Sequence, residues 1–235
     1  MKIAVVNQST QLTDADVHTM TGAVGQQVID HFAPAWPIDP TTVTFYPATA
    51  DPPAGGWTIV MLDDADQANA LGYHATDPNG NPYGRVFANP VLQAGGAVLD
   101  GGTIGVSVAS VLSHETLETL ADYDANDWSQ AADGTLWARE VADPVESFGY
   151  TITLGTTPVL VSDFVLPAFF DPGASRPYDH LDKLTAGFSI SPGGYAIEMT
   201  GGQPQQVQGE NYPAWRTATK AFPAARTARR LRHSR

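Results

Sequence analysis

One short segment of the sequence carries possible metal ligands at helical spacing. It reads SHETLE, residues 113–118, and places His114 four residues before Glu118. Side chains four residues apart lie on one face of a helix, about a turn from each other. A histidine and a carboxylate in that arrangement can bind one divalent cation. Glu115 lies about 100° further round the helix, where it can accept a proton from a water on that cation.

The residues around this segment predict a buried helix from about residue 103 to residue 122. A buried helix should not carry ionisable groups without partners, because an isolated buried charge costs several kcal/mol. The ionisable side chains of this helix therefore indicate a site. Apolar residues recur at helical spacing and cover most of its circumference: Ile104, Val106, Val108, Val111, Leu112, Leu117 and Leu120.

A metal site needs at least one more ligand, which must come from downstream. The richest stretch is WAREVADPVE, residues 137–146, with three carboxylates in an otherwise apolar setting. Glu140 and Asp143 are the preferred third ligands. Asp124 is a rival, because a helix that ends and turns back can place it over its own face. Asp122 lies near the His114 face and is expected to support the ligands.

The donor types restrict the metal. One histidine with two carboxylates suits Zn²⁺, and it also suits Mn²⁺ or Fe²⁺. Cysteine is absent, which excludes thiolate ligands and disulfides. The predicted cofactor is therefore Zn²⁺, with Mn²⁺ or Fe²⁺ as alternatives.

The segment resembles the active-site helix of the zincin metallopeptidases, which carries His-Glu-x-x-His after a mixed sheet. His114 and Glu115 match the first ligand and the general base of that motif, and Glu118 stands in place of its second histidine. The longer run SHETLETLAD, residues 113–122, is also similar to one in uncharacterised phage and bacterial proteins. The resemblance implies a zincin-like fold over residues 1–125 and metal-dependent hydrolysis of a peptide or protein substrate.

Two other functional classes remain open. A non-enzymatic structural or virion-associated protein would use the same ligands as a closed or vestigial metal site. An enzyme acting on sugars could pair Glu115 with Glu140, although no feature of the sequence suggests a carbohydrate groove. The preferred hypothesis is a metal-dependent hydrolase of the peptidase type.

Three further polar positions are interpreted as structural. His74 precedes a turn-rich segment and a short strand at 85–88, taken as the sheet edge. It could polarise a carbonyl or join the metal, but a surface loop is the preferred interpretation. The polar run at 178–182 lies among prolines and glycines and is expected to be a loop. Tyr195, at a strand start, is expected in the core.

Charge divides the chain into two parts. Residues 1–215 contain five basic and all 25 acidic residues, a net charge of −20, whereas the last 20 residues hold seven basic ones. The acidic body argues against nucleic acid as its partner. The basic tail could contact an acidic surface or nucleic acid, or extend into solvent.

Residues 1–6 lack the apolar region of a signal peptide, and no apolar run could cross a bilayer. A cytoplasmic or phage-packaged protein without membrane contact is expected; the oligomeric state stays open.

The alternation of patterns predicts an α+β fold. Strands are expected at 3–8, 42–46, 57–62 and 85–88, with helices from 13 or 14 to about 32 and from 103 to 122. The nearly all-apolar 57–62 run is expected in the centre of a zincin-like mixed sheet. An irregular, mostly β region over 126–200, with strands at 137–141, 150–154, 159–161 and 195–199, should complete the site. An extended basic tail, 201–235, follows.

Overall fold

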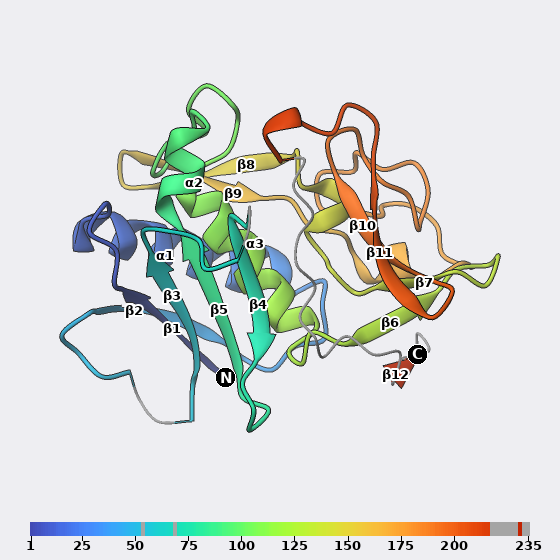
Figure 1. Ribbon diagram of the computed structural model, residues 1–235, viewed down its shortest axis with the longest axis horizontal. Coiled ribbons are helices and arrows are strands. Elements are labelled where there is room, and N and C mark those ends of the chain that lie inside the picture. The colour runs from blue at the N-terminus through green and yellow to red at the C-terminus, as the bar shows by residue number, and fades with distance from the viewer. Residues whose placement is uncertain (53–54, 68–69, 217–229, 232–235) are drawn as a thin grey trace.

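Five strands from the first 87 residues form one mixed sheet. The computed structural model describes residues 1–52, 55–67, 70–216 and 230–231 (Figure 1). The strand order is β2-β1-β3-β5-β4, so the predicted 57–62 strand does lie in the centre. The strands are β1 (Lys2–Asn7), β2 (Thr42–Pro47), β3 (Trp57–Leu62), β4 (Gly72–Thr76) and β5 (Pro82–Phe87).

The edge of this sheet differs from the prediction. β1, β2, β3 and β5 run parallel, whereas β4 is antiparallel to β5, with His74 opposite Gly84. The edge strand is therefore β4, and β5 lies inside the sheet. The two strands are joined by a tight turn in which the Asp77 carboxylate accepts hydrogen bonds from the backbone N–H groups of Asn79 and Asn81.

Local capping signals set where the main helices begin. In α1 (Asp14–Gln27), Thr13 and Asp16 form a reciprocal capping box, and a π-helical turn continues the helix to Phe32. In α3 (Val108–Ala121), Ser107 is the N-cap and bonds reciprocally with Ser110. The helix thus begins five residues later than predicted, because Ser107 is extended and pairs with Ala97. A short helix, α2 (Ala88–Gln93), follows β5.

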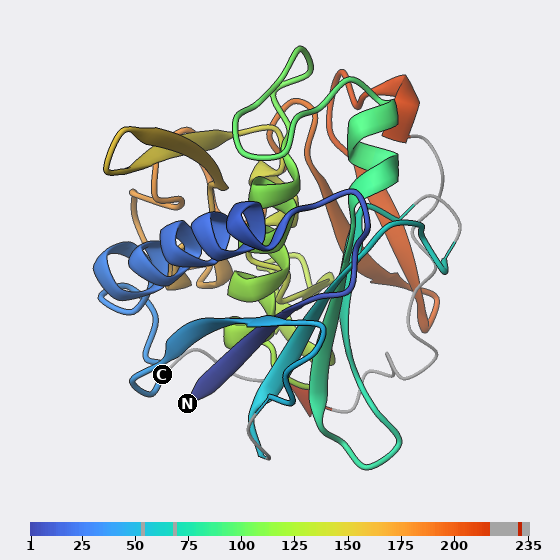
Figure 2. The same ribbon diagram turned by 90° about the vertical axis from the view of Figure 1, so that its left-hand side faces the viewer.

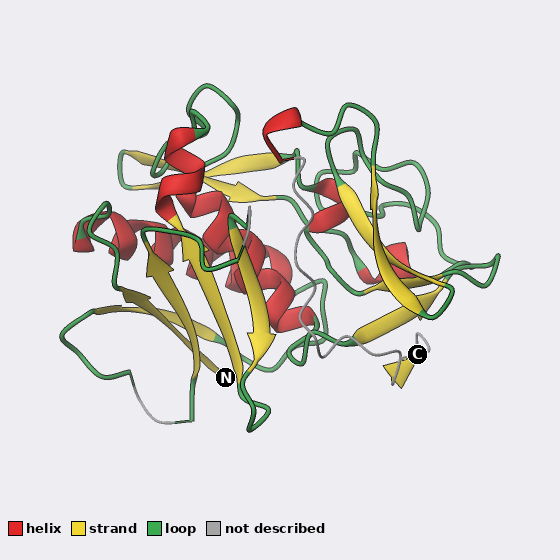
Figure 3. Cartoon of the chain, viewed as in Figure 1, coloured by secondary structure: helices red, strands yellow, loops and turns green. Residues whose placement is uncertain are grey.

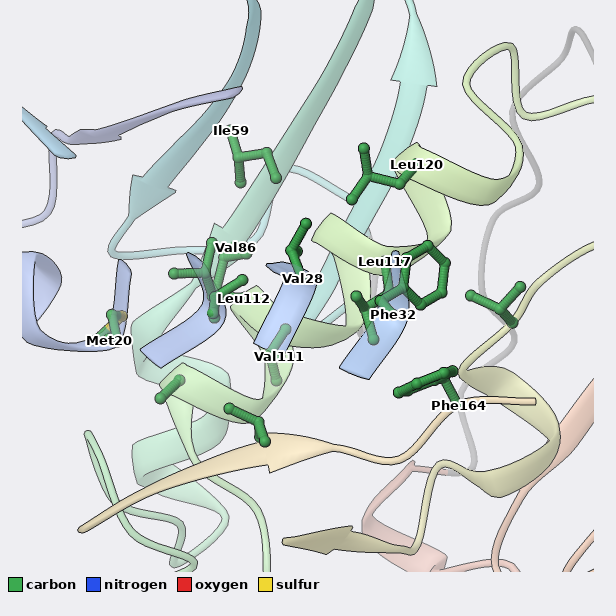
Figure 4. Close-up of a cluster of buried hydrophobic side chains, with 14 of the residues drawn as sticks. Met20, Val28, Phe32, Ile59, Val86, Val111, Leu112, Leu117, Leu120 and Phe164 are labelled. Atoms are coloured by element: carbon green, nitrogen blue, oxygen red, sulfur yellow. The ribbon is translucent and has the colours of Figure 1, made fainter. Parts of the chain in front are cut away.

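The two main helices pack between the sheet and a two-stranded hairpin, β8 (Gly149–Leu154) and β9 (Thr157–Ser162) (Figure 2). Apolar side chains from all these layers form one core (Figure 4). Val28 and Phe32 continue α1 into this core beside Leu117 of α3. Burying such side chains stabilises each by about 1.5–3 kcal/mol relative to exposure.

The second half of the chain is built mostly of strands and loops, as predicted (Figure 3). Its sheet has the order β11-β10-β7-β6-β12. The strands are β6 (Asp127–Gln130), β7 (Leu136–Ala138), β10 (Tyr195–Thr200), β11 (Gln203–Gln208) and β12 (Arg230–Leu231), and 3-10 turns cover Asp143–Val145, Pro167–Phe170 and Ala214–Arg216. The protein is thus α+β, with α1 and α3 as its main helices.

Two predicted segments have other bounds in the structure or extend beyond the described residues. The strand predicted at 137–141 stops at Ala138, and residues 139–142 lead into the 3-10 turn Asp143–Val145. Five of the seven basic residues of the predicted tail lie outside the described residues: Lys220, Arg226, Arg229, Arg232 and Arg235. Within the described part of the chain, no helix has the length and apolar character to span a membrane.

Candidate metal centre

The side chains of the predicted site come from three elements. The second half of α3 supplies His114, Glu115 and Glu118, β4 supplies His74, and the chain after β7 supplies Glu140 and Asp143. All six are buried, with exposed fractions from 0 to 6%. Buried carboxylates and histidines at such density need mutual contacts or bound cations to offset their lost hydration.

Three of these residues form the group that the sequence predicted. The His114 Nε2 atom lies 3.1 Å from Glu118 Oε1 and 3.1 Å from Asp143 Oδ1. One ligand atom from each of the three lies within 4.8 Å of the others. The three side chains can therefore hold one metal ion with a nitrogen and two oxygens.

A second group forms around His74, where the prediction of a surface loop is wrong. His74 lies in β4 and is 4% exposed. Its Nδ1 atom is 3.4 Å from Glu118 Oε2 and 3.7 Å from Glu115 Oε2, and the ligand atoms of these three residues also fall within 4.8 Å. The antiparallel pairing of β4 with β5 turns His74 towards α3, which no local sequence signal indicated.

The other candidate ligands lie elsewhere. Glu140 Oε2 is 3.6 Å from His74 Nε2, on the opposite side of the imidazole from Glu115 and Glu118. Asp124 lies with Asp122 and Asp127 in a separate group at the end of α3, where Asp122 accepts hydrogen bonds from backbone N–H groups. Of the proposed third ligands, only Asp143 is grouped with His114 and Glu118 among the described residues.

The carboxylates determine the charge state of both histidines. Burial alone would lower the pKa of His74, but contacts with Glu115 and Glu118 outweigh burial and raise the pKa to about 9. His114 behaves in the same way: burial opposes the charged form, and Glu118 and Asp143 raise its pKa well above 6.5. Without a cation, both imidazoles are protonated at neutral pH. A metal ion must displace these protons to bind.

A pocket reaches the site from the side of the 3-10 turn at 214–216. His114 and Glu115 form part of its wall, together with Ser110 from the same helix face. The apolar part of the wall comes from Leu71, Val106, Val111, Phe148 and Leu160. A small molecule or side chain in this pocket would therefore lie beside His114 and Glu115.

Two further features of the pocket were not predicted. Tyr195 is 3% exposed, as a core residue should be, but it also lines the pocket. Burial and the charges of Asp143 and Glu146 raise the pKa of its phenol well above 10, so the hydroxyl stays protonated. Arg216, the first basic residue of the tail, lines the same wall and forms a buried ion pair with Glu146. Their separation of 70 residues leaves no local signal for this pair.

Comparison of the chain with models of known protein families, with curated proteins and with solved structures finds no significant match. The function must therefore be argued from the side chains of the site. Their arrangement is compatible with metal binding, and the pocket gives a second molecule access to it.

Proposed function

We propose that the protein is a metal-dependent hydrolase of the peptidase type, with its catalytic cation on His114, Glu118 and Asp143. The observation that carries the proposal is this buried three-residue group, of which His114 lines a pocket. Zn²⁺ fits it best, because catalytic zinc sites commonly combine three nitrogen or oxygen ligands with one open position. Mn²⁺ or Fe²⁺ also accept this donor set.

The residues meet the requirements of such a cation. His114 Nε2, Glu118 Oε1 and Asp143 Oδ1 lie close enough to bind one ion after small adjustments. Two carboxylates offset the charge of a divalent cation in a buried setting. When bound, the cation lowers the pKa of a coordinated water towards neutrality and polarises a carbonyl oxygen.

Glu115 is the proposed general base. It follows His114 in sequence, so its carboxylate lies beside the ligands, and it lines the pocket. A carboxylate there can take a proton from the attacking water and pass it to the leaving group. The protonated hydroxyl of Tyr195, which lies near Asp143 and lines the same pocket, can donate a hydrogen bond to developing negative charge.

The pocket supports a substrate that carries an apolar group. Leu71, Val111 and Phe148 give it an apolar wall next to Glu115, whereas Gln206 and Arg216 give it a polar side. Such a surface suits an apolar side chain followed by polar backbone. A peptide or protein substrate meets both conditions.

The resemblance to zincins supports the same proposal. The antiparallel edge strand β4 lies beside the helix that carries the motif, in a mixed sheet otherwise parallel. We propose on this basis that residues 1–125 have a zincin-like arrangement. Glu118 in place of histidine gives the cation a more anionic set of ligands, which makes it a weaker Lewis acid.

The test is a peptidase screen of zinc-loaded protein with Glu115→Gln. The substitution keeps the shape of the side chain but removes its basicity, so turnover should fall by about 10²–10⁴-fold while the ion at His114 stays bound. Glu210→Gln, the same change at an exposed position, should leave activity unaltered. Equal activity of wild type and Glu115→Gln would refute the assignment.

One observation favours a second candidate. Glu118 and Asp143 are fully buried, as ligands of a structural metal site are. A structural or virion-associated protein would then use the ion to hold α3 against the 3-10 turn at 143–145. This alternative predicts that metal removal lowers stability and that no substrate is hydrolysed in the screen.

A further inference from the structure

The Glu118 carboxylate faces two histidines, each with a different oxygen. Its Oε1 atom lies 3.1 Å from His114 Nε2, and its Oε2 atom lies 3.4 Å from His74 Nδ1. The two histidine-containing groups that can hold an ion therefore share this one side chain. Paired metal ions about 3.5–4 Å apart are commonly held in this way.

We propose that a second divalent cation binds to His74, Glu115 and Glu118, so that Glu118 bridges a pair of ions. The proposal rests on the site at His114 described above. It assigns a function to His74, which belongs to a different element from the predicted motif. The second site offers one nitrogen and two carboxylate oxygens, a donor set that suits Zn²⁺, Mn²⁺ or Fe²⁺.

The charges in the site support two ions rather than one. Four buried carboxylates surround the two histidines: Glu115, Glu118, Glu140 and Asp143. One divalent cation at His114, with His74 still protonated, would leave a net charge of −1 in a buried region. Two divalent cations balance all four carboxylates, which removes the cost of leaving uncompensated charge away from water.

Glu115 supplies an independent indication of a ligand. Its side chain is 2% exposed, and its Oε2 atom makes no hydrogen bond among the described residues. That atom points towards His74 Nδ1 at 3.7 Å. Buried polar atoms are normally hydrogen-bonded, whereas this oxygen has only the ion-pair contact with His74, beyond hydrogen-bond distance, in the described part of the chain. A cation between Glu115 and His74 would give this oxygen a direct partner.

The backbone of β4 leaves space for this carboxylate. A Cβ atom at Gly72 would lie 2.8 Å from Glu115 Oε1 and 2.9 Å from its Cγ atom. Any larger residue at this position would push the Glu115 side chain away from His74. The glycine thus lets the helix carboxylate reach the edge strand.

Glu140 contacts the nitrogen of His74 that does not face the proposed ion. It lies 3.6 Å from His74 Nε2, the nitrogen that faces away from Glu118. A carboxylate beside the outer nitrogen of a ligating histidine holds the proton there and leaves the inner nitrogen free for the metal. Glu140, predicted as a ligand, is assigned here to the orientation of His74.

The second ion has a consequence for Glu115. A carboxylate that binds a cation is a weaker base, so Glu115 acts as general base only in molecules whose second site is empty. The ratio of bound metal to protein then decides its role.

The experiment counts the ions bound by the full-length chain. Chelator-treated protein is dialysed against increasing Mn²⁺, and bound metal is measured by mass spectrometry. Wild type should bind two ions, His74→Ala one, and His18→Ala, which removes an exposed histidine, two. His74→Gln should also bind one and serves if His74→Ala fails to fold. Two adjacent Mn²⁺ ions should broaden each other's EPR signal, whereas a single ion should not.

Three results would overturn the proposal in distinguishable ways. Saturation of wild type at one ion that His114→Ala removes would reject the second site and keep the proposed function. No bound ion would reject both. Two ions in both His74 variants, with the broadened EPR signal retained, would show that the second ion binds without His74.

Discussion

Two groups of histidines and carboxylates in the chain differ in what contacts their oxygens. The ligand cluster comprises His74, His114, Glu115, Glu118, Glu140 and Asp143, and its contacts described above run between side chains. The aspartate cluster comprises Asp163, Asp179, His31, His180 and Tyr150. There the backbone is the main hydrogen-bond donor.

In the aspartate cluster the carboxylates have structural partners. Asp163 accepts hydrogen bonds from the N–H groups of Phe164 and Leu181, at 2.8 and 3.3 Å. Asp179 accepts from Lys183 and Leu184, at 2.9 and 2.7 Å. These bonds fix the loop around residues 178–184, which agrees with the structural interpretation of the 178–182 run.

The histidines of the two clusters also differ. His180 stacks on Phe164 and His31 with ring centroids 5.0 and 4.9 Å apart, and burial and His31 lower its pKa. His74 and His114 instead face carboxylates, which raise their pKa values. Burial of polar groups alone therefore does not indicate a functional site. Groups whose ligand atoms all lie within reach of one ion, as in the ligand cluster, are compatible with metal binding.

The largest expected effect concerns pH and the aspartate cluster. Burial and the neighbouring Asp179 raise the pKa of Asp163 to about 8. Because this folded-state pKa lies above the unfolded value near 3.8, Asp163 favours folding at low pH, and that contribution is lost as pH rises to 8. Asp163→Asn keeps the acceptor oxygen and removes the ionisation. It should flatten the fall in stability between pH 4 and 8.

The measurement is urea denaturation across this pH range. One pKa unit corresponds to about 1.4 kcal/mol. The difference in free energy of unfolding between Asp163→Asn and wild type should therefore be several kcal/mol more favourable to the variant at pH 8 than at pH 4. Asp51→Asn, at an exposed position, should not alter the slope. An unchanged slope in Asp163→Asn would show that Asp163 is ionised in the folded protein.

The second prediction compares how much one substitution in each cluster lowers the free energy of unfolding in the absence of metal. Asp179→Ala should cost about 2–4 kcal/mol, because two backbone N–H groups lose their acceptor. Glu115→Gln should cost less, about 1–2 kcal/mol, because the protonated His74 loses the charge of Glu115 but keeps those of Glu118 and Glu140. Chemical denaturation in chelator measures both. A larger loss in Glu115→Gln would make the ligand cluster as structural as the aspartate cluster.

The third prediction compares how much metal stabilises variants of the two clusters. Zn²⁺ at 100 times its dissociation constant should stabilise wild type by about 2.7 kcal/mol. For a chain of this size that corresponds to a rise of about 5–10 °C in Tm. Asp163→Asn should keep this rise, and His114→Ala should show a smaller one because it loses the ion at His114, as thermal denaturation with and without chelator would show. A rise in His114→Ala equal to that of wild type would place the ion elsewhere.

The smallest expected effect concerns the space beside Glu115. Gly72→Ala should cost about 1–2 kcal/mol and weaken metal binding, because its Cβ atom would contact Glu115 and the Arg85 carbonyl oxygen at 2.8–2.9 Å. Gly25→Ala, in α1 with no contact under 3.7 Å, should be neutral or stabilising. Denaturation and a metal titration of both variants are the measurements. Unchanged metal affinity in Gly72→Ala would contradict the position given to Glu115.

Local sequence signals explain which parts of the fold could be predicted. Thr13 and Asp16 identified the start of α1, and the apolar run at 57–62 identified the central strand, because capping and burial depend on adjacent residues. β4 was missed. All but the last of its five residues are buried, so it shows no alternation of apolar and polar residues, and its pairing with β5 is a tertiary property.

The site could be predicted only in part for the same reason. His114, Glu115 and Glu118 stand out because helical spacing is local. The composition of residues 137–146 pointed to Glu140 and Asp143, but only the turn after β7 brings Asp143 to His114 and Glu140 to His74. The participation of His74 depends on the position of β4 at the sheet edge, which no residue near His74 specifies.

Elemental analysis of purified, untagged protein tests the central claim most directly. Wild type, His114→Ala, Glu118→Ala and Asp163→Asn would be compared after incubation with excess zinc and removal of free metal. We predict at least one zinc per chain in wild type and Asp163→Asn, and loss of the His114-bound ion in the other two. An absence of metal from all four samples would contradict the account and leave the ligand cluster without its proposed cation.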